Sequence, residues 1–251
     1  MPSTFIRSVA SLVTLVTALA VACNADPGAD NGKGDQIPAP LPPSTTTETY
    51  PPGPYDVMPG ATIQDYQFSG FPDAQVSRAA LVKIRLSDFY NPHGSDASYH
   101  PADAANDDRL YPPGSPYGAG KTKPLGLFID VATVWCAPCN LEAKTELPAK
   151  HAKYRHCGGE FLFQLAEGAA PGTPPTPKNL TDWTTFYKVD YPATIDPVRQ
   201  LAALYSGGMF PDGVIIDTRT MKIVEVVSGL PDESVWQTFE STLDVTCLAG
   251  K

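Results

Sequence analysis

The chain has 251 residues, of which 42% are hydrophobic, and this is enough for one domain with a proper hydrophobic core. Its formal net charge is −9. Such an acidic surface repels the phosphate backbone of DNA and RNA, so the composition argues against a nucleic-acid-binding function.

The first 22 residues have the pattern of a signal peptide. Arg7 supplies a short positive start, an apolar run follows over 9–22, and Ala20 and Ala22 form a small-residue cleavage site. The run is too short, and too often interrupted by Ser and Thr, to be a membrane span. We therefore predict that residues 1–22 are removed and that the protein is exported, which permits disulfides.

Cys23 follows the predicted cleavage site directly. This arrangement resembles a bacterial lipobox, in which the cysteine is acylated and becomes the mature N-terminus, although Ala20 stands where that pattern prefers Leu. We predict lipidation of Cys23; the alternative is a soluble secreted protein in which Cys23 is a spare thiol. Residues 23–55 are rich in Pro, Gly, Asp and Thr and contain few large apolar side chains, which predicts a disordered tether.

Residues 56–251 are predicted to form one domain. It begins with two short strands over 61–70 and 78–90, joined by a turn that contains proline. A long insertion over 91–121 follows, with turn-forming residues throughout and no periodicity. The histidines and aspartates of the insertion match neither the spacing of an EF-hand nor that of a zinc site, so we predict a solvated loop without a bound metal.

Strands and helices alternate in the rest of the chain. A continuous apolar run over 123–135 predicts a buried central strand, and the helix after it is expected to kink at Pro148 and to end at Gly158. We predict further strands at 160–168 and 191–196, a hairpin over 213–229, and helices at 180–188, 197–205 and 232–248. This order is typical of an α/β fold with a mixed central sheet flanked by helices.

Two cysteines, Cys136 and Cys139, stand between the central strand and its helix. We consider three roles for them. A structural zinc site needs four ligands, often as two close pairs, and the remaining candidates, Cys157 and Cys247, are far apart in sequence. A fixed disulfide across so short a spacer would stabilise the fold little. We therefore favour the third role, a redox-active pair.

The position of the pair at the start of a helix supports redox chemistry. Unpaired N–H groups and the positive end of the helix dipole favour a thiolate there, and such thiols have pKa values of roughly 3.5–7.5. Cys136 is thus expected to be exposed and to attack, while Cys139, one turn deeper, resolves the mixed disulfide. We expect Pro138 to tune the reduction potential and Trp135 to shield the pair, although simple packing explains Trp135 equally well.

Two stretches of the chain carry a family resemblance. "FIDVATVWCAPC" (128–139), together with the order of the elements, resembles the thioredoxin fold, and residues 191–229 are similar to the second half of the TlpA/ResA-like redoxins. The resemblance implies a thioredoxin-like fold with an N-terminal β-hairpin extension and an inserted strand and helix before a cis-proline. It also implies the activity of a thiol–disulfide oxidoreductase.

The resemblance implies roles for two carboxyl groups. Asp130 matches the buried Asp of thioredoxins, which exchanges a proton with the second cysteine, and burial raises a carboxyl pKa in a way that suits this work. Glu142 lies one helical turn after Cys139 and matches a Glu that ResA-like proteins carry beside the active site. An ordinary acidic residue in the first turn of a helix is an equally good interpretation of Glu142.

The resemblance also places a cis-proline opposite the cysteines. Pro211 matches that position, and Phe210 before it is expected to pair with the extended chain of a client protein. The family commonly has a small or β-branched residue where this chain has Phe210, so the preference for clients stays open. Pro192 is a second candidate for the cis position, and a trans turn proline is the alternative for Pro211.

Cys157 and Cys247 are the cysteines that remain. In a thioredoxin fold, the helices that carry them pack on the same face of the sheet and end at the same pole, so the resemblance implies a structural disulfide between them. Closure of a loop of about 90 residues contributes roughly 4–5 kcal/mol to stability in the chain-entropy model. The alternative is a pair of free buried thiols.

We therefore predict an exported thiol–disulfide oxidoreductase, without a cofactor, that acts on disulfides or thiols of client proteins. The resemblance suggests a reductant, in cytochrome c maturation or in general envelope redox homeostasis, and a reductant requires a membrane electron donor. We expect a monomer in the bacterial periplasm or cell envelope that touches the membrane only through the lipid on Cys23. No nucleic-acid partner is expected.

Two other functions remain open from the sequence. Peroxiredoxins carry a Pro-x-x-x-Thr/Ser-x-x-Cys motif; Thr133 fits this motif, but Ile129 stands at the position of its proline. The fold also serves in binding modules that have no turnover. Peroxide consumption and insulin reduction are the assays that separate these functions.

Overall fold

The structure is a computed structural model that describes residues 49–74, 78, 80–102, 106–205 and 208–250. The predicted signal peptide, Cys23 with its predicted lipid, and most of the predicted tether lie outside these residues. The last part of the tether is described and packs on the domain, because the Tyr50 hydroxyl donates to the carbonyl oxygen of Ile63 at 2.8 Å. No helix in the described part of the chain is long and apolar enough to cross a membrane.

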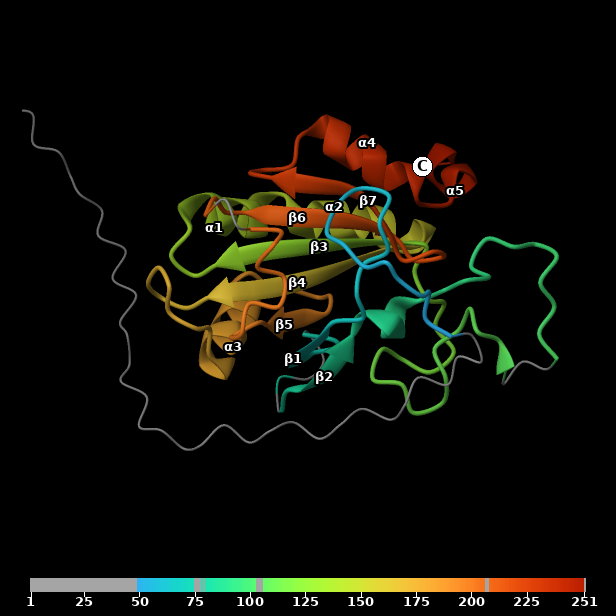
Figure 1. The fold of residues 1–251 in the computed structure, drawn as a ribbon, viewed down its shortest axis with the longest axis horizontal. Coiled ribbons are helices and arrows are strands. Elements are labelled where there is room, and N and C mark those ends of the chain that lie inside the picture. The colour runs from blue at the N-terminus through green and yellow to red at the C-terminus, as the bar shows by residue number, and fades with distance from the viewer. Residues whose placement is uncertain (1–48, 75–77, 79, 103–105, 206–207, 251) are drawn as a thin grey trace, which may run out of the picture. The chain divides into compact units, whose positions relative to one another are not determined.

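Seven strands of the described residues form one mixed sheet, in the order β2-β1-β5-β4-β3-β6-β7 (Figure 1). β3, β4 and β5 run parallel to one another, and the strands on both sides of them are added antiparallel. The strands are β1 (Gln67–Phe71), β2 (Val82–Arg85), β3 (Gly126–Thr133), β4 (Gly159–Glu167), β5 (Ala193–Ile195), β6 (Asp212–Asp217) and β7 (Lys222–Ser228). The mixed sheet of the predicted α/β fold is thus confirmed.

The central strand β3 is buried along its whole length, in agreement with its uninterrupted apolar sequence. Successive side chains of a strand point to opposite faces of the sheet. Phe128 and Ala132 join the hydrophobic cluster on one face, whereas Ile129 and Val131 join the cluster on the other. Asp130 lies between Phe128 and Ala132 on the first face, so β3 places a carboxyl group inside the core.

A kinked helical segment leads away from β3. It consists of α1 (Ala137–Thr145), α2 (Leu147–Tyr154) and the 3-10 turn η3 (Arg155–Cys157). The break falls at Glu146, just before Pro148, because proline has no N–H to donate and cannot continue the first helix. Gly158 ends the segment with a left-handed φ of 88°, which is a conformation that glycine adopts without a Cβ clash. The predicted kink and end of this helix are confirmed.

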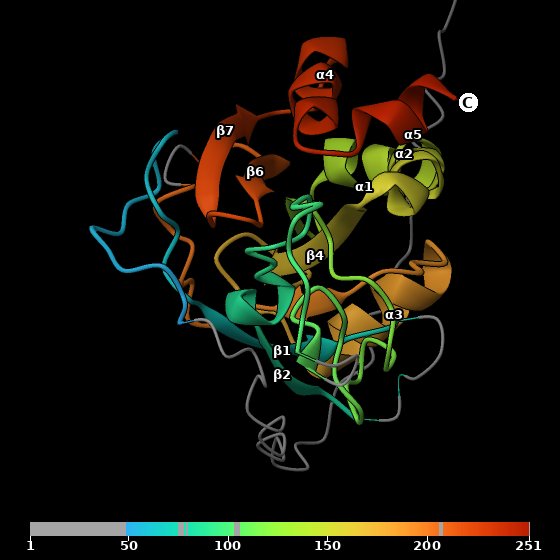
Figure 2. The same ribbon diagram turned by 90° about the vertical axis from the view of Figure 1, so that its right-hand side faces the viewer.

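The α-helices cover one face of the sheet, as Figure 2 shows for α1, α2 and α3 (Pro177–Phe186). Side chains from α1 to α4 (Glu233–Ser241) join the cluster on this face, where Trp236 stacks near Phe161 with 5.9 Å between ring centroids. The 3-10 helix η1 (Leu86–Phe89) and the chain before β1 cover the other face. Cys136 and Cys139 therefore lie at the start of a helix whose inner side is packed on the sheet.

The segment 197–205 corrects the sequence prediction. It forms consecutive turns instead of the predicted short helix. Asp196 uses its carboxylate to accept the backbone N–H of Leu201 at 3.2 Å and the hydroxyl of Tyr205 at 3.3 Å, which holds the chain in turns. Arg199 has a left-handed φ of 56°, which is incompatible with an α-helix.

The predicted terminal helix over 232–248 is also divided. α4 ends at Ser241, and a separate short helix, α5 (Val245–Ala249), begins after Asp244. The Asp244 carboxylate accepts the backbone N–H groups of Thr246 and Cys247, and this cap starts a new helix in a new direction. The apolar periodicity of the sequence continues across this cap, and periodicity alone therefore predicts one uninterrupted helix.

The insertion over 91–121 is more ordered than the predicted solvated loop. Tyr111 is buried, and its ring stacks on Tyr117 with 4.9 Å between centroids. The Tyr117 hydroxyl donates to the Asp88 carboxylate at 2.9 Å. The described part of the insertion is therefore anchored to η1 through its tyrosines.

Candidate active site

Cys136 and Cys139 lie at the carboxyl end of β3, where α1 begins, and they form a disulfide. Cys136 is the N-cap residue of α1, and Pro138 occupies its first turn, where no N–H is needed. The backbone N–H of Cys139 points at the Cys136 sulfur at 3.1 Å. A thiolate on Cys136 would accept this hydrogen bond at the positive end of the helix dipole, so the local structure favours ionisation of this sulfur.

The burial of Cys136 differs from the prediction. In the disulfide form only 3% of Cys136 is exposed, and Cys139 is 2% exposed. The expectation of an exposed attacking cysteine is wrong for this oxidised state, because the disulfide turns both sulfurs toward the cluster under α1. The neighbours at the rim are open instead: Pro138 is exposed, and Trp135 is 38% exposed.

Trp135 is held in place by a carboxylate that the sequence analysis did not identify. Its indole N–H donates to Glu167 at 2.8 Å. Glu167, at the end of β4, also accepts the backbone N–H of Gly172 at 3.0 Å and pairs with Arg199. A carboxyl group that ends a buried strand was the available signal, but its partners lie in other segments of the chain.

Phe210 and Pro211 lie beside the cysteine pair. The Phe210–Pro211 peptide bond is cis, and Pro211 directly precedes β6, which pairs antiparallel with β3 so that Asp212 faces Val131. This register brings the start of β6 to the end of β3. The rings of Trp135 and Phe210 meet edge to face, with 5.9 Å between centroids. Pro192, the second candidate, is not among the cis bonds of the described residues.

Asp130 on β3 and Glu142 on α1 are both buried, and each is only 2% exposed. Among the described residues, the Oδ1 atom of Asp130 and both carboxyl oxygens of Glu142 have no hydrogen-bond partner. Burial raises the pKa of Asp130, and burial together with the charge of Asp130 raises the pKa of Glu142. Because each charge disfavours the other in this dry site, the pair retains a proton at neutral pH.

This geometry bears on the role of Glu142. An ordinary acidic residue in the first turn of a helix points to solvent, where it interacts with the helix dipole. Glu142 instead faces the core cluster from the second turn of α1. An unpaired buried carboxyl group destabilises a fold, and such groups gather at functional sites. The arrangement can take up a proton released by a cysteine and return it later.

Asn140 and Tyr187 complete the surroundings of Cys136, and the sequence analysis missed both. The side-chain amide of Asn140 donates to the carbonyl oxygen of Val134 at 3.1 Å and to that of Cys136. The Tyr187 hydroxyl, at the end of α3, donates to the Oδ1 atom of Asn140. A polar residue directly after the second cysteine was a weak signal, and its partner 47 residues away was not visible in the sequence.

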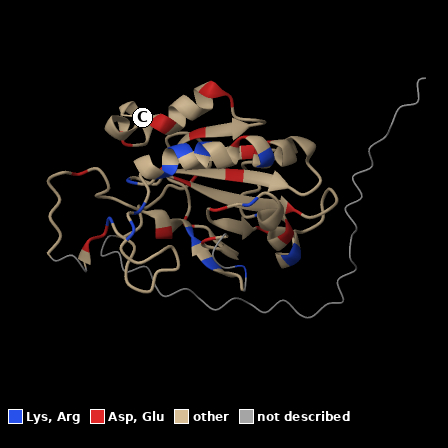
Figure 3. Ribbon diagram, turned by 180° about the vertical axis from the view of Figure 1, so that it is seen from behind, with Lys and Arg blue, Asp and Glu red and all other residues tan. Residues whose placement is uncertain are grey.

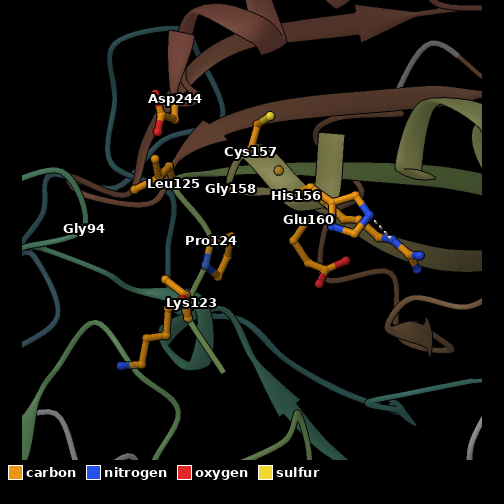
Figure 4. A pocket seen from close by; sticks show the side chains of 12 residues that line it. Gly94, Lys123, Pro124, Leu125, His156, Cys157, Gly158, Glu160 and Asp244 are labelled. Atoms are coloured by element: carbon orange, nitrogen blue, oxygen red, sulfur yellow. Dashed lines mark hydrogen bonds between the residues drawn. The ribbon is translucent and has the colours of Figure 1, made fainter. Parts of the chain in front are cut away.

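The other end of the sheet holds the second disulfide. Cys157, at the end of η3, is joined to Cys247 in α5, 90 residues later. A cavity of about 340 Å³ lies beside this bond and is lined by Lys123, Leu125 and Gly158, among others (Figure 4). Because β3 runs from this cavity toward Cys136, the cavity is separate from Cys136 and Cys139.

Charged side chains near the second disulfide are paired. Figure 3 shows Lys and Arg residues along α2 and η3. Lys153 of α2 contacts Glu240 at 2.6 Å, and Arg155 of η3 contacts Asp190 at 3.2 Å. His151, which is 3% exposed, lies 3.0 Å from a carboxylate oxygen of Asp190 and 3.0 Å from one of Glu160. In the described part of the chain, no group of three or more His, Cys, Asp or Glu side chains is arranged to hold a metal ion.

Comparisons with known proteins agree with this arrangement. No protein-family profile matches the chain. Over 113 residues the chain is 28% identical to the thiol-disulfide oxidoreductase ResA of Bacillus subtilis (strain 168), a match that covers 45% of this chain and 58% of that protein. The chain thus matches little more than half the length of this curated relative. The predicted resemblance to ResA-like proteins is confirmed.

Solved structures give a more distant likeness. The chain is similar to a secreted thiol-disulfide isomerase from Corynebacterium glutamicum, with a TM-score of 0.49 and 16% identity over 83% of this chain and 98% of that chain. It is also similar to a DsbF homologue from Corynebacterium diphtheriae, with a TM-score of 0.46 and 15% identity over 80% and 96% of the two chains. The topology of the chain itself is the argument for the fold. Around the cysteine pair the chain passes through β3, α1 with α2 and β4, and later through the β6–β7 hairpin and α4. The fold is thioredoxin-like.

Proposed function

We propose that the protein is an exported thiol–disulfide oxidoreductase in which Cys136 and Cys139 exchange disulfides with client proteins. One observation carries this proposal. The disulfide of these residues lies at the N-terminus of α1, with an N–H group 3.1 Å from the Cys136 sulfur, and the two elements that meet there, β3 and α1, each carry a buried carboxyl group. A structural disulfide needs neither a donor at its sulfur nor carboxyl groups without partners on these elements.

In the reducing direction, the cycle begins with both cysteines as thiols. The Cys136 thiolate attacks one sulfur of a client disulfide, and a new bond forms between Cys136 and the client. The client's own S–S bond breaks, and its other sulfur leaves as a thiolate. Neither protein has yet gained or lost an electron pair overall, because one disulfide has replaced another.

The second step needs a proton acceptor. Cys139 attacks the Cys136 sulfur only as a thiolate, so its proton has to leave while the sulfur is buried. Asp130 is the acceptor in this proposal, with Glu142 sharing the proton because the two groups cannot both be charged in the dry site. The Cys136–Cys139 disulfide forms, the client leaves with two thiols, and two electrons have passed to it.

Client docking would use the rim around the pair. In this proposal the rim consists of Trp135, Pro138 and Phe210, with Met209, which is 62% exposed, next to Phe210 in the chain. Pro211, which follows Phe210, is buried. An exposed apolar rim of this kind suits an unfolded or extended client segment better than a charged folded surface. The left-handed turn at Arg199 and the carboxylate of Glu167 would keep Trp135 oriented toward this rim.

The direction and the location are further parts of the proposal. A reductant would have to be reduced again by a dithiol donor at the membrane, and its clients would include proteins of cytochrome c maturation or of general envelope redox homeostasis. The signal-peptide pattern and the lipobox-like Cys23 support a lipid-anchored protein in the periplasm or cell envelope, with secretion as the alternative. We expect it to act as a monomer.

Insulin reduction tests the proposed activity. Wild type in the presence of dithiothreitol should accelerate the precipitation of insulin chains, and Cys136→Ser should reduce the rate to that of dithiothreitol alone. The matched control is Cys157→Ser combined with Cys247→Ser, assayed below its unfolding temperature, which should retain the activity. A wild type without activity toward insulin or any reduced or oxidised model peptide would contradict the proposal and favour a binding module.

A further inference from the structure

Asn140 connects two carbonyl groups on either side of the turn that presents Cys136. Its amide nitrogen is within hydrogen-bond distance of the carbonyl oxygens of Val134 and Cys136. Both neighbours are acceptors only, so the NH₂ end of the amide has to face them. The backbone N–H of Asn140 also donates to the Cys136 carbonyl, at 3.1 Å. One residue thus ties the end of the β3 segment to the start of α1.

Tyr187 fixes the orientation of this amide. Its hydroxyl donates to the oxygen of the Asn140 side chain, which is the end of the amide that faces away from the carbonyl groups. The Tyr187 ring packs on Trp183, with 4.7 Å between centroids, and Trp183 stacks on Phe163 of β4 at 5.2 Å. The hydroxyl is therefore anchored to the hydrophobic core and supplies a stable donor.

The two residues bear on the sulfur of Cys136 through its backbone. The position of that sulfur relative to the N–H of Cys139 depends on the turn from Thr133 to Cys136, where the N–H of Cys136 donates to the Thr133 carbonyl at 3.2 Å. A turn held only by this bond would let the sulfur move away from the helix N-terminus. The amide hydrogens of Asn140 also bring positive partial charge to the carbonyl groups beside the sulfur.

We propose that Asn140 and Tyr187 are positioning residues that hold the Cys136 sulfur against the N-terminus of α1 and thereby increase its thiolate fraction. The inference rests on the proposed function, because it concerns the attacking cysteine of that reaction. Both residues act through the backbone around Cys136. A polar side chain in a first turn often bonds only to its own helix, and the bond from Tyr187, 47 residues away, is what distinguishes this arrangement.

The test is the pH profile of Cys136 alkylation in the reduced protein. Wild type, Asn140→Ala, Tyr187→Phe and Tyr154→Phe are reacted with iodoacetamide between pH 4 and 10, and the peptide that carries Cys136 is quantified by mass spectrometry. Tyr154→Phe is the matched control, because its hydroxyl bonds to Glu240 at the other end of the domain. Circular dichroism establishes that each variant is folded.

The expected result is a shift of the alkylation midpoint. Asn140→Ala should raise it by about one pH unit, which is about tenfold less thiolate at a pH below the midpoint. Tyr187→Phe should raise it by roughly half a unit, in the same direction, because the amide then loses only its orienting partner. Tyr154→Phe should leave it unchanged.

A midpoint in Asn140→Ala or Tyr187→Phe that stays within about 0.2 units of wild type would overturn the inference. If Asn140→Ala fails to fold, Tyr187→Phe decides alone, since it removes one oxygen from a partly buried side chain. The alkylation profile requires no client. An active wild type whose variants show no shift contradicts only the positioning role, whereas shifted variants of an inactive wild type support that role and contradict the proposed function.

Discussion

The two disulfides of this chain occupy opposite ends of the same sheet, and their sulfurs have opposite surroundings. The Cys136 sulfur is 3.1 Å from an N–H donor, the amide of Cys139. The Cys247 sulfur is 3.4 Å from a carbonyl oxygen, that of His156. A donor stabilises a thiolate, whereas a carbonyl dipole opposes it. Exposure alone would point to Cys247 as the reactive cysteine, because Cys247 is half-buried and Cys136 is almost fully buried.

The carboxyl groups at the two ends differ in the same way. Asp190 and Glu160 share the buried His151, whose pKa would fall through burial but is raised to about 9 by its hydrogen bonds to them. Asp130 and Glu142 have no such partner among the described residues. Satisfied charges stabilise a fold, and unsatisfied ones are kept where chemistry needs them. We therefore propose that the carboxyl groups at one end stabilise the fold and those at the other end transfer protons.

Removal of the attacking sulfur should have the largest effect. Cys136→Ser is expected to lower insulin reduction to the uncatalysed rate, because the serine hydroxyl is not a nucleophile toward disulfides at neutral pH. Its unfolding midpoint should change by little, since the loop that the pair closes is very short. A variant that keeps more than about a tenth of the wild-type rate would show that another thiol does the chemistry.

Removal of the second disulfide should affect stability alone. Cys157→Ser with Cys247→Ser is expected to lower the free energy of unfolding by about 4–5 kcal/mol, the chain-entropy value for a loop of this length. Urea unfolding at pH 7 measures the loss, and insulin reduction at low temperature measures the activity. A double variant that is as stable as wild type but inactive would contradict this, because it would make Cys157–Cys247 the pair needed for activity.

Asp130→Asn should slow client reduction by about a hundredfold, or about 2.7 kcal/mol in the activation free energy, because the proton of Cys139 loses its acceptor. Stability should change in the opposite sense. The pKa of Asp130 is raised in the folded state, so its contribution to stability is present below the unfolded pKa of about 4 and is lost as the pH rises.

The Asn variant cannot ionise and should therefore be at least as stable as wild type at pH 8. Parallel urea unfolding and insulin reduction at pH 8 check both parts, and Glu142→Gln serves as the matched variant. Loss of both activity and stability in Asp130→Asn would mean that the group is structural, which contradicts the comparison of the two ends.

His151→Gln should have the smallest effect and should act on stability only. Loss of the buried cation between two carboxylates is expected to cost about 2 kcal/mol at pH 6. The folded pKa of about 9 exceeds the ordinary value of 6.5, so this contribution is present below pH 6.5 and is lost as the pH rises through about 9.

The difference in unfolding free energy between wild type and His151→Gln should therefore shrink from pH 6 to pH 9.5. Urea unfolding at several pH values measures it, with insulin reduction as the control that should not change. A difference that grows with pH would contradict the charge state assigned to His151.

Local patterns carried most of the sequence prediction. The buried strand, the cysteines, the helix start and the kink at Pro148 all depend on residues that are neighbours in the chain, and these features were predictable. The cis bond before Pro211 and the union of Cys157 with Cys247 followed from a family resemblance rather than from the residues themselves.

The remaining features depend on contacts between distant segments. The bond from Trp135 to Glu167 and the bond from Tyr187 to Asn140 each join separate elements, and no periodicity reports them. The predicted helix over 197–205 failed for a related reason: the Asp196 carboxylate accepts groups of the following residues and holds the chain in turns. Cys136 is buried because it packs with the hydrophobic cluster on which α1 lies, and its place at a helix start in the sequence does not report this packing.

The most direct test of the account is a redox titration in which both cysteine pairs are followed separately by alkylation and mass spectrometry. The Cys136–Cys139 disulfide should open reversibly between about −120 and −270 mV, the range of known oxidoreductases, while Cys157–Cys247 should stay closed until below about −300 mV. If Cys157–Cys247 opens first, or both pairs open at one potential, the division of the molecule into a redox end and a structural end is contradicted.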